Sequence, residues 1–174
     1  MKFWPPWVLY KFMKFLVISD IHDNLVNLKK CVNWGKAENI ENAICCGDVV
    51  NSETLQYLSE SFKTLHLVPG TPALYDEAEI KKYKNIKYLG RFGVFELDGK
   101  TIGLCHEPWY IKSVLKIKSC QIIFYGHTHE PWIEEKAGLI TANPGTLGGV
   151  FNKASFAVYD SANGNLELKI LELL

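Results

Sequence analysis

Short runs of apolar residues recur along the chain, and in its first half segments with helical spacing separate them. The run over residues 15–19 is continuously apolar and ends in Ser-Asp, as a strand buried on both faces does. Asn24 can cap a helix whose apolar positions form one stripe: Leu25, Leu28, Cys31 and Val32. Further strands are expected at 43–46 and 65–68, with a helix from Ser52 between them. This order predicts a parallel sheet with helical crossovers.

The second half of the chain is richer in strands. Residues 90–97 and 101–105 flank an Asp-Gly pair, which is typical of a β-hairpin with a tight turn. An apolar strand is expected at 121–125. Two more strand pairs flank turn residues, at 132–135 with 139–142 and at 155–159 with 165–171. With no internal repeat or linker, the pattern predicts one α/β domain.

Length, charge and cysteine content narrow the class of protein. The chain has 174 residues, within the ~100–200 residues of one domain. Lysine plus arginine and aspartate plus glutamate both number 19, so the basic excess of a nucleic-acid-binding protein is missing. An apolar fraction of 48% indicates a globular chain. Five cysteines, an odd number, favour a reduced intracellular protein, and we expect it in the cytoplasm.

The first twelve residues are apolar and aromatic but fit no targeting segment. Pro5 and Pro6 interrupt the apolar run that a signal peptide needs, and Lys11 and Lys14 come too early for a membrane span. One interpretation is that Met13 is the true start and that residues 13–174 form the single domain. The other is that residues 1–12 are an arm that packs on the domain or on a partner, which could support a homodimer.

Side chains suited to chemistry follow the ends of four predicted strands. Asp20 and His22 follow the first strand, and Asp48 follows the second. His106 follows residues 101–105, and His127 and His129 follow residues 121–125. Sites of open α/β sheets form outside the carboxyl ends of the strands. We therefore expect these two aspartates and four histidines to converge at one edge of the sheet.

Carboxylate and imidazole groups together suit divalent ions such as manganese, iron and zinc. Because alternate residues of an extended segment point to the same side, Asp20 and His22 are expected to face one ion, as are His127 and His129. Six ligands are too many for one tetrahedral ion with an open position, but they suit two ions ~3.5–4 Å apart that share a carboxylate. Asp48 is the candidate for that bridge.

From about Met13 to its end, the sequence resembles the calcineurin-like metallophosphoesterases, in particular their small single-domain, YfcE-like phosphodiesterase branch. Five motifs carry the resemblance: Ser19-Asp20-Ile21-His22-Asp23-Asn24, Cys46-Gly47-Asp48, Cys105-His106, Gly126-His127-Thr128-His129 and Asn143-Pro144-Gly145-Thr146. The last motif is expected to be structural, with a tight turn and an asparagine that hydrogen-bonds backbone groups. The resemblance implies a four-layer α-β-β-α sandwich of two mixed sheets with flanking helices.

The resemblance also implies ligands and a reaction. One ion would be held by Asp20, His22, Asp48 and His129, and the other by Asp48, His106, His127 and an asparagine. The ions would be manganese, with iron, nickel or zinc as alternatives. A metal-bound hydroxide would attack the phosphorus of a small phosphodiester, with Asp48, His106 and Asp20 in the catalytic centre.

The asparagine ligand is where the sequence departs from the family. Thr71 stands where the family has asparagine, and Pro72 stands where it has histidine or cysteine. A hydroxyl is the poorer ligand, so the second ion should bind more weakly or take a water in that place. If Thr71 weakens the site, Thr71→Asn should raise its occupancy and the rate. Asp76 or Glu77 could act as a substitute ligand. Glu107 is a second departure, because the family usually has Gly-His after the histidine.

Two functions of different class follow from these residues. The first is a metal-dependent phosphodiesterase, weakened by the loss of the asparagine. Without a general acid at position 72, it would favour substrates with good leaving groups. The alternative is a catalytically degraded protein that serves as a metal-stabilised scaffold for binding other proteins. Six of the seven ligand positions are kept, and buried Asp and His groups without a cation would be costly, which favours the enzyme.

Overall fold

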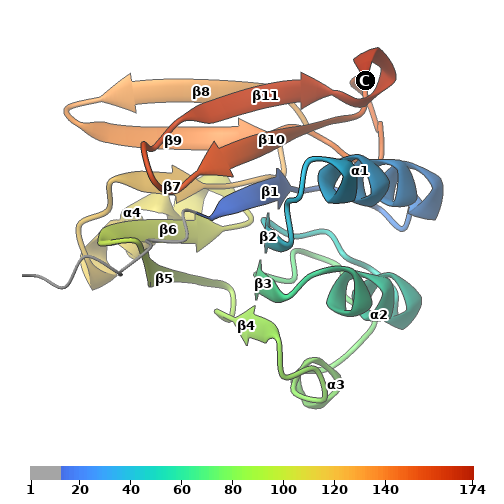
Figure 1. The fold of residues 1–174 in the computed structure, drawn as a ribbon. Helices are drawn as coiled ribbons and strands as arrows, with labels where there is room; N and C mark the ends of the chain where they lie inside the picture. Colours follow the sequence, from blue (N-terminus) through green and yellow to red (C-terminus); the bar gives the residue numbers. More distant parts are fainter. Residues whose placement is uncertain (1–12) are drawn as a thin grey trace, which may run out of the picture.

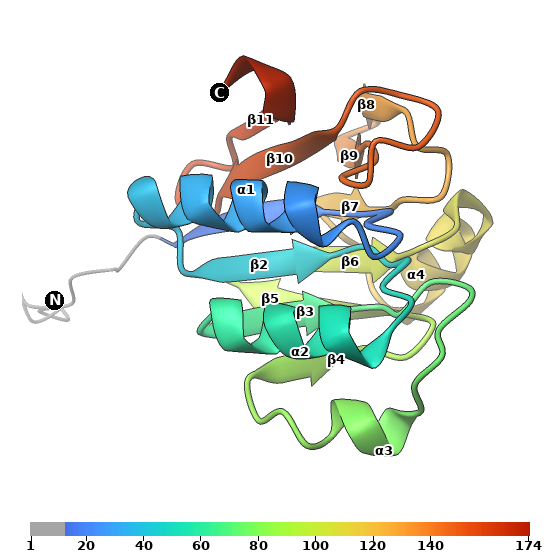
Figure 2. The same ribbon diagram turned by 90° about the vertical axis from the view of Figure 1, so that its right-hand side faces the viewer.

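The structure, a computed structural model, describes residues 13–174 and consists of two mixed β-sheets with helices on their outer faces (Figure 1). The six-stranded sheet has the order β11-β10-β1-β2-β3-β4, and the five-stranded sheet has the order β5-β6-β7-β9-β8. Helices α1, α2 and α3 cover the first sheet, and α4 covers the second (Figures 1 and 2). This is the expected α-β-β-α sandwich. The expectations for residues 1–12, a spurious start or an arm, lie outside the described residues.

The elements follow the hydrophobic pattern closely, and most predicted bounds are within one or two residues of those observed. In chain order they are β1 (Lys14–Ile18), α1 (Leu25–Ala37), β2 (Asn42–Cys45), α2 (Ser52–Ser61), β3 (Thr64–Leu67), α3 (Glu77–Ile80), β4 (Ile86–Tyr88), β5 (Phe92–Leu97), β6 (Lys100–Cys105), α4 (Ile111–Ile117), β7 (Ile122–Phe124), β8 (Pro131–Lys136), β9 (Leu139–Pro144), β10 (Ser155–Asp160) and β11 (Leu166–Ile170). The pattern missed α3, β4 and α4, which have only four, three and seven residues and are too short to show a clear period.

The direction of the strands explains why the carboxyl ends of several of them lie close together. Strands β1 to β4 run parallel, and so do β6, β7 and β9. Strand β10 is antiparallel to β1, and β5 and β8 are antiparallel edge strands of the second sheet. The carboxyl ends of β1 and β2 therefore lie on one side of the molecule, and the loops after them can meet those after β6 and β7.

Three apolar clusters fill the three spaces between the four layers. Strand β1 shows the principle, because Leu16 and Ile18 pack under the helices while Phe15 and Val17 pack against the second sheet. A third, smaller cluster lies under α4. A strand that is buried on both faces is fixed in register and position. The loops that follow these strands consequently start from rigid points.

None of the helices in residues 13–174 is long and apolar enough to cross a membrane.

Candidate metal centre

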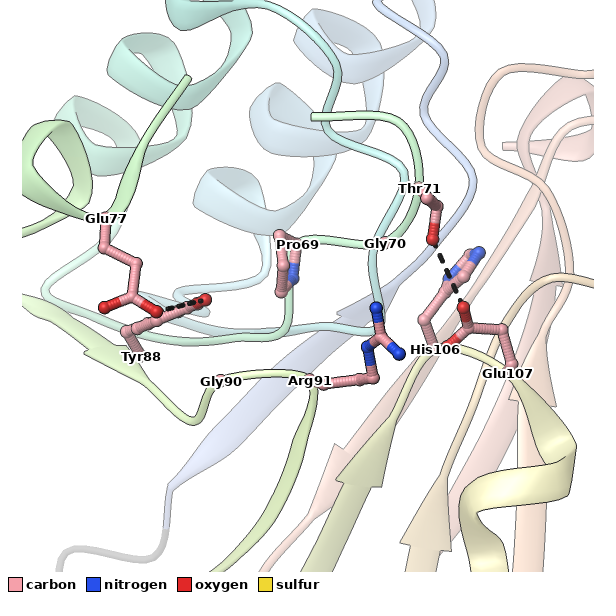
Figure 3. A pocket seen from close by; sticks show the side chains of 9 residues that line it. All are labelled: Pro69, Gly70, Thr71, Glu77, Tyr88, Gly90, Arg91, His106 and Glu107. Atoms are coloured by element: carbon pink, nitrogen blue, oxygen red, sulfur yellow. Dashed lines mark hydrogen bonds between the residues drawn. The ribbon is translucent and has the colours of Figure 1, made fainter. Parts of the chain in front are cut away.

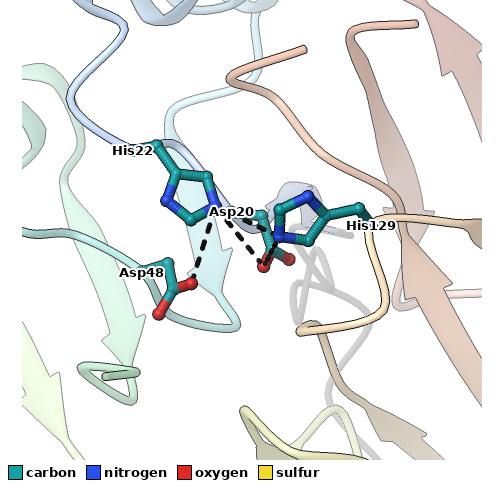
Figure 4. Close-up of side chains that lie close together, drawn as sticks. All are labelled: Asp20, His22, Asp48 and His129. Carbon is teal, nitrogen blue, oxygen red and sulfur yellow. Dashed lines mark hydrogen bonds and ion pairs between the residues drawn. The ribbon is translucent and has the colours of Figure 1, made fainter. Parts of the chain in front are cut away.

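Four side chains gather between the ends of the two sheets (Figure 4). Asp20 and His22 follow β1, Asp48 follows β2, and His129 follows β7. One ligand atom of each lies within 4.8 Å of those of the other three. Asp20, Asp48 and His129 are buried, and His22 is half-buried. Oxygen and nitrogen donors packed this closely are an arrangement suited to a divalent cation.

The two histidines of this group point ring nitrogen atoms at each other. Nε2 of His22 lies 3.1 Å from Nε2 of His129, which is also 3.1 Å from Oδ1 of Asp20. Nδ1 of His129 lies 3.1 Å from the carbonyl oxygen of Val150. Because a carbonyl can only accept a hydrogen bond, Nδ1 carries the proton, and Nε2 of the neutral ring offers its lone pair to the group.

The other side of Asp48 faces a fifth predicted ligand. Nε2 of His106 lies 3.1 Å from Oδ1 of Asp48, while Oδ2 of Asp48 lies 3.6 Å from Nε2 of His22. Nδ1 of His106 donates a hydrogen bond to the carbonyl of Cys46 over 2.8 Å. His106 is 1% exposed, and its Nε2 has no hydrogen-bond partner among the described residues. A buried nitrogen of this kind is costly unless it binds something, and a cation beside Asp48 would satisfy it.

Electrostatics in the metal-free protein couple Asp48 to His106. Burial by itself would raise the pKa of Asp48, but His106, the Thr71 backbone N–H and His22 together lower it. Burial would lower the pKa of His106, but the carboxylates of Asp48 and Asp20 and the Cys46 carbonyl raise it. The metal-free pair therefore tends to hold a proton. Because a metal ligand must be a neutral imidazole, binding of a cation would release that proton.

His127 lies on the His106 side of the site. Its ring packs edge-to-face on His106, with centroids 5.3 Å apart, and on the exposed Trp109 at 5.0 Å. Its backbone N–H donates to both carboxylate oxygens of Asp20, at 3.2 and 3.1 Å. The group of four includes His129 but not His127, although alternation placed both toward one ion. Their segment is a loop beyond β7 rather than an extended strand.

Backbone conformation, not strand alternation, aims the side chains. Five of the six predicted ligands have positive φ angles, and these are Asp20 (51°), His22 (46°), Asp48 (53°), His127 (70°) and His129 (61°). Such a conformation costs ~1–3 kcal/mol for a residue other than glycine and concentrates at functional sites. Gly47, at φ 118°, lies so close to His106 that a Cβ there would come within 2.6 Å of its Nδ1. The predicted sharp turn before Asp48 is thus confirmed.

Thr71 lies beside Asp48, in the position where the asparagine was expected. Its backbone N–H donates to Oδ1 of Asp48 over 2.9 Å, and its hydroxyl donates to Oε1 of Glu107 over 3.2 Å. Neither of the substitute ligands suggested by the sequence is in this position. Asp76 caps α3 by accepting from the Glu79 N–H, and Glu77 accepts from the Tyr88 hydroxyl at 3.5 Å. The glutamate near the site is Glu107, which sequence reasoning noted only as a departure.

The end of β9 and the loop after it support the site from behind, as their motif predicted. The buried Asn143 side chain donates to the carbonyl of Gly126 and to the hydroxyl of Thr128, both at 2.9 Å, and accepts from the N–H of Gly145 at 2.8 Å. The Thr146 hydroxyl donates to the Asp20 carbonyl at 3.1 Å. These bonds tie the histidine loop and the aspartate loop to one frame.

A cavity of about 310 Å³ adjoins the centre (Figure 3). One side of the cavity is formed by His106, Glu107 and Thr71. Tyr88 and Arg91 also line it. Arg91 is the only arginine in the sequence, a signal that the sequence reasoning did not use. Its Nη1 donates to the Tyr110 hydroxyl over 2.8 Å, and no carboxylate in residues 13–174 pairs with it.

The fold recurs in solved structures of small phosphoesterases and of a sorting protein. The chain superposes on a structure described as a novel archaeal phosphodiesterase with a TM-score of 0.80 and 22% identity, over 91% of this chain and 99% of that one. The Escherichia coli phosphoesterase YfcE superposes with a TM-score of 0.67 and 18% identity, over 91% of this chain and 100% of that one. Vacuolar protein sorting 29 of Cryptosporidium parvum superposes with a TM-score of 0.66 and 21% identity, over 91% of this chain and 96% of that one.

Sequence comparison gives the family. A phosphodiesterase of Methanocaldococcus jannaschii is 28% identical over 146 residues, which are 79% of this chain and 86% of that protein. The profile of the calcineurin-like phosphoesterase superfamily domain matches residues 13–164, which include all six predicted ligands. The chain thus belongs to the calcineurin-like phosphoesterase superfamily.

Proposed function

We propose that this protein is a phosphodiesterase that works with two divalent ions. The observation that carries the proposal is the position of Asp48, whose two oxygens face Nε2 of His22 on one side and the buried Nε2 of His106 on the other. One ion would be held by Asp20, His22, Asp48 and His129, and the other by Asp48, His106 and His127. Manganese is our first choice, with iron, nickel and zinc as alternatives.

The bound ions would supply a nucleophile from water at neutral pH and a Lewis acid for the phosphoryl oxygens. The chain's own part is to hold the ligand atoms in place. His106 and His129 are each fixed by a hydrogen bond from Nδ1 to a backbone carbonyl, which leaves Nε2 free. Asp20 is held by the His127 N–H. Loss of such a supporting bond typically lowers metal affinity or activity ~10–100-fold.

The substrate would enter the cavity beside His106. At about 310 Å³, the cavity is at the small end of the ~300–1,000 Å³ typical of ligand sites, which favours a small phosphodiester. Figure 3 shows the Arg91 guanidinium directed toward the side formed by His106 and Glu107. Its planar fork matches two phosphate oxygens. We infer that Arg91 binds the phosphodiester group.

Hydrolysis of bis(4-nitrophenyl) phosphate by the manganese-loaded protein tests the proposal, with 4-nitrophenyl phosphate as the monoester comparison. We expect turnover of the diester and a loss on the order of 10²–10³-fold or more in Asp48→Asn, the scale of removing one electrostatic stabiliser. Glu130→Gln is the matched control, because Glu130 is exposed and precedes β8. Equal rates in wild type and Asp48→Asn would contradict the proposal.

A second candidate function is a scaffold that binds other proteins. The fold likeness to vacuolar protein sorting 29 and the change at Thr71 favour it. If the protein binds metal but neither wild type nor Asp48→Asn hydrolyses any phosphoester, this candidate replaces the enzyme. For either function we place the protein in the cytoplasm, since all five cysteines are free and buried.

A further inference from the structure

We propose that Glu107 is a protein ligand of the second ion, in place of the amide that the sequence lacks at position 71. The inference rests on the proposed dinuclear site and names one more residue of it. It assigns a role to a carboxylate that the sequence reasoning set aside as a departure.

The first observation is that Glu107 is buried at the site without a cation to balance it. Its residue is 9% exposed, and its carboxylate accepts one hydrogen bond, from the Thr71 hydroxyl at 3.2 Å. No lysine or arginine of the described residues forms an ion pair with it. A buried carboxylate is stable only when it is paired, hydrogen-bonded or bound to a metal. The carboxylate has acceptor sites beyond the one that takes this hydroxyl, and it faces a cavity that a ligand can enter.

The second observation is the nitrogen atom that faces the same space. Glu107 and His106 are neighbours in the chain and both line the cavity in Figure 3. His106 is 1% exposed, and Asp48 is the one described side chain that forms an ion-pair contact with its Nε2. Asp48 completes the set, since Oδ1 of Asp48 is 3.1 Å from that nitrogen and accepts the Thr71 N–H at 2.9 Å. One divalent ion would serve all three groups.

Position 71 has a different part in this arrangement. The Thr71 backbone N–H holds Asp48, and its hydroxyl holds Glu107. Thr71 therefore positions two ligands instead of acting as one. A carboxylate brings a negative charge that an amide does not, so the second ion should bind firmly and should favour oxygen-preferring ions such as manganese. This differs from the weak second site expected from Thr71 as the ligand.

Manganese titration of the full chain, followed by calorimetry and by electron paramagnetic resonance, separates these possibilities. Wild type is expected to bind two ions and to give the spectrum of a spin-coupled pair. Glu107→Gln should weaken the second ion at least ~10-fold and give the spectrum of a single ion. Thr71→Val, which removes the hydroxyl that holds Glu107 but keeps the carboxylate, should weaken the second ion less than Glu107→Gln does. The exposed control Glu130→Gln should keep two ions. Circular dichroism of each metal-free variant checks the fold.

The outcomes also separate this inference from the function on which it rests. If wild type binds fewer than two ions, the dinuclear proposal fails and the role of Glu107 fails with it. If wild type and Glu107→Gln both bind two ions with equal affinity, only the inference fails. If Thr71→Val loses the second ion while Glu107→Gln keeps it, the hydroxyl is the ligand and the inference is overturned. A rise in occupancy in Thr71→Asn would likewise support a weak site at Thr71.

Discussion

His66, the one histidine outside the metal centre, should make the metal-free protein sensitive to acid. It lies on β3 between the two sheets, 9% exposed, and its ring stacks on Phe95 with centroids 3.8 Å apart. Its Nδ1 is buried without a hydrogen-bond partner. Burial, and in second place the charge of Lys87 across the strand pair, lower the pKa of His66 from 6.5 to about 4.

The magnitude follows from that difference in pKa. Between pH 6.5 and about 4, the unfolded chain takes up a proton at this residue that the folded protein does not. Stability therefore falls as the pH falls through this window. At ~1.36 kcal/mol per pKa unit, His66 costs ~2 kcal/mol of unfolding free energy by pH 5 and at most ~3 kcal/mol below pH 4. A loss of ~2 kcal/mol corresponds to a drop of ~4–8 °C in Tm for a chain of this size.

The assay is denaturant unfolding of the protein in EDTA at pH 7.5 and pH 5, for wild type and for His66→Phe. Phenylalanine keeps an aromatic ring on Phe95 but cannot titrate, and His66→Leu serves as a second variant if the larger ring does not fit. The other four histidines are common to both proteins, so the change in the stability difference reports His66 alone. We expect the variant to gain ~2 kcal/mol on wild type between the two pH values. Parallel pH profiles would refute the reasoning.

Three further predictions concern the site and the core. Gly47→Ala should lower the free energy of unfolding by ~1–3 kcal/mol and impair manganese binding, because the new Cβ meets His106. Thermal unfolding and manganese titration measure these effects, and the control Gly99→Ala, at an open turn, should leave manganese binding unchanged. Arg91→Ala should raise the KM for bis(4-nitrophenyl) phosphate ~10–100-fold at unchanged metal content, as loss of a charged hydrogen bond does, and an unchanged KM would exclude a contact with substrate. Burial raises the pKa of all five cysteine thiols, Cys31, Cys45, Cys46, Cys105 and Cys120. The folded protein should therefore not react with an aromatic disulfide reagent at pH 8, whereas all five thiols should react in guanidinium. A thiol that reacts fast in the folded protein would contradict this.

Much of the fold could be predicted from the sequence, because strands buried on both faces leave an unmistakable apolar run. β1, β2 and β3 were found in this way, and the three hairpins were found from their turn residues. The Asn24 cap of α1 was confirmed by its bond to the Asn27 N–H. The short elements α3 and α4 were missed. Four and seven residues are too few to show a helical period, and tertiary packing holds them in place.

The sequence by itself determined which residues are the candidates for the chemistry, since aspartate and histidine after strand ends can be recognised from their order alone. It misplaced how they converge, because alternation applies to extended strands and these ligands lie in loops with positive φ angles. Only the tertiary structure brought Glu107 to Thr71, 36 residues away in the chain, and placed the buried Nε2 of His106 beside Asp48. The physical reason is that a pairing between loops of two different sheets depends on how those sheets pack, and no local pattern records that distance.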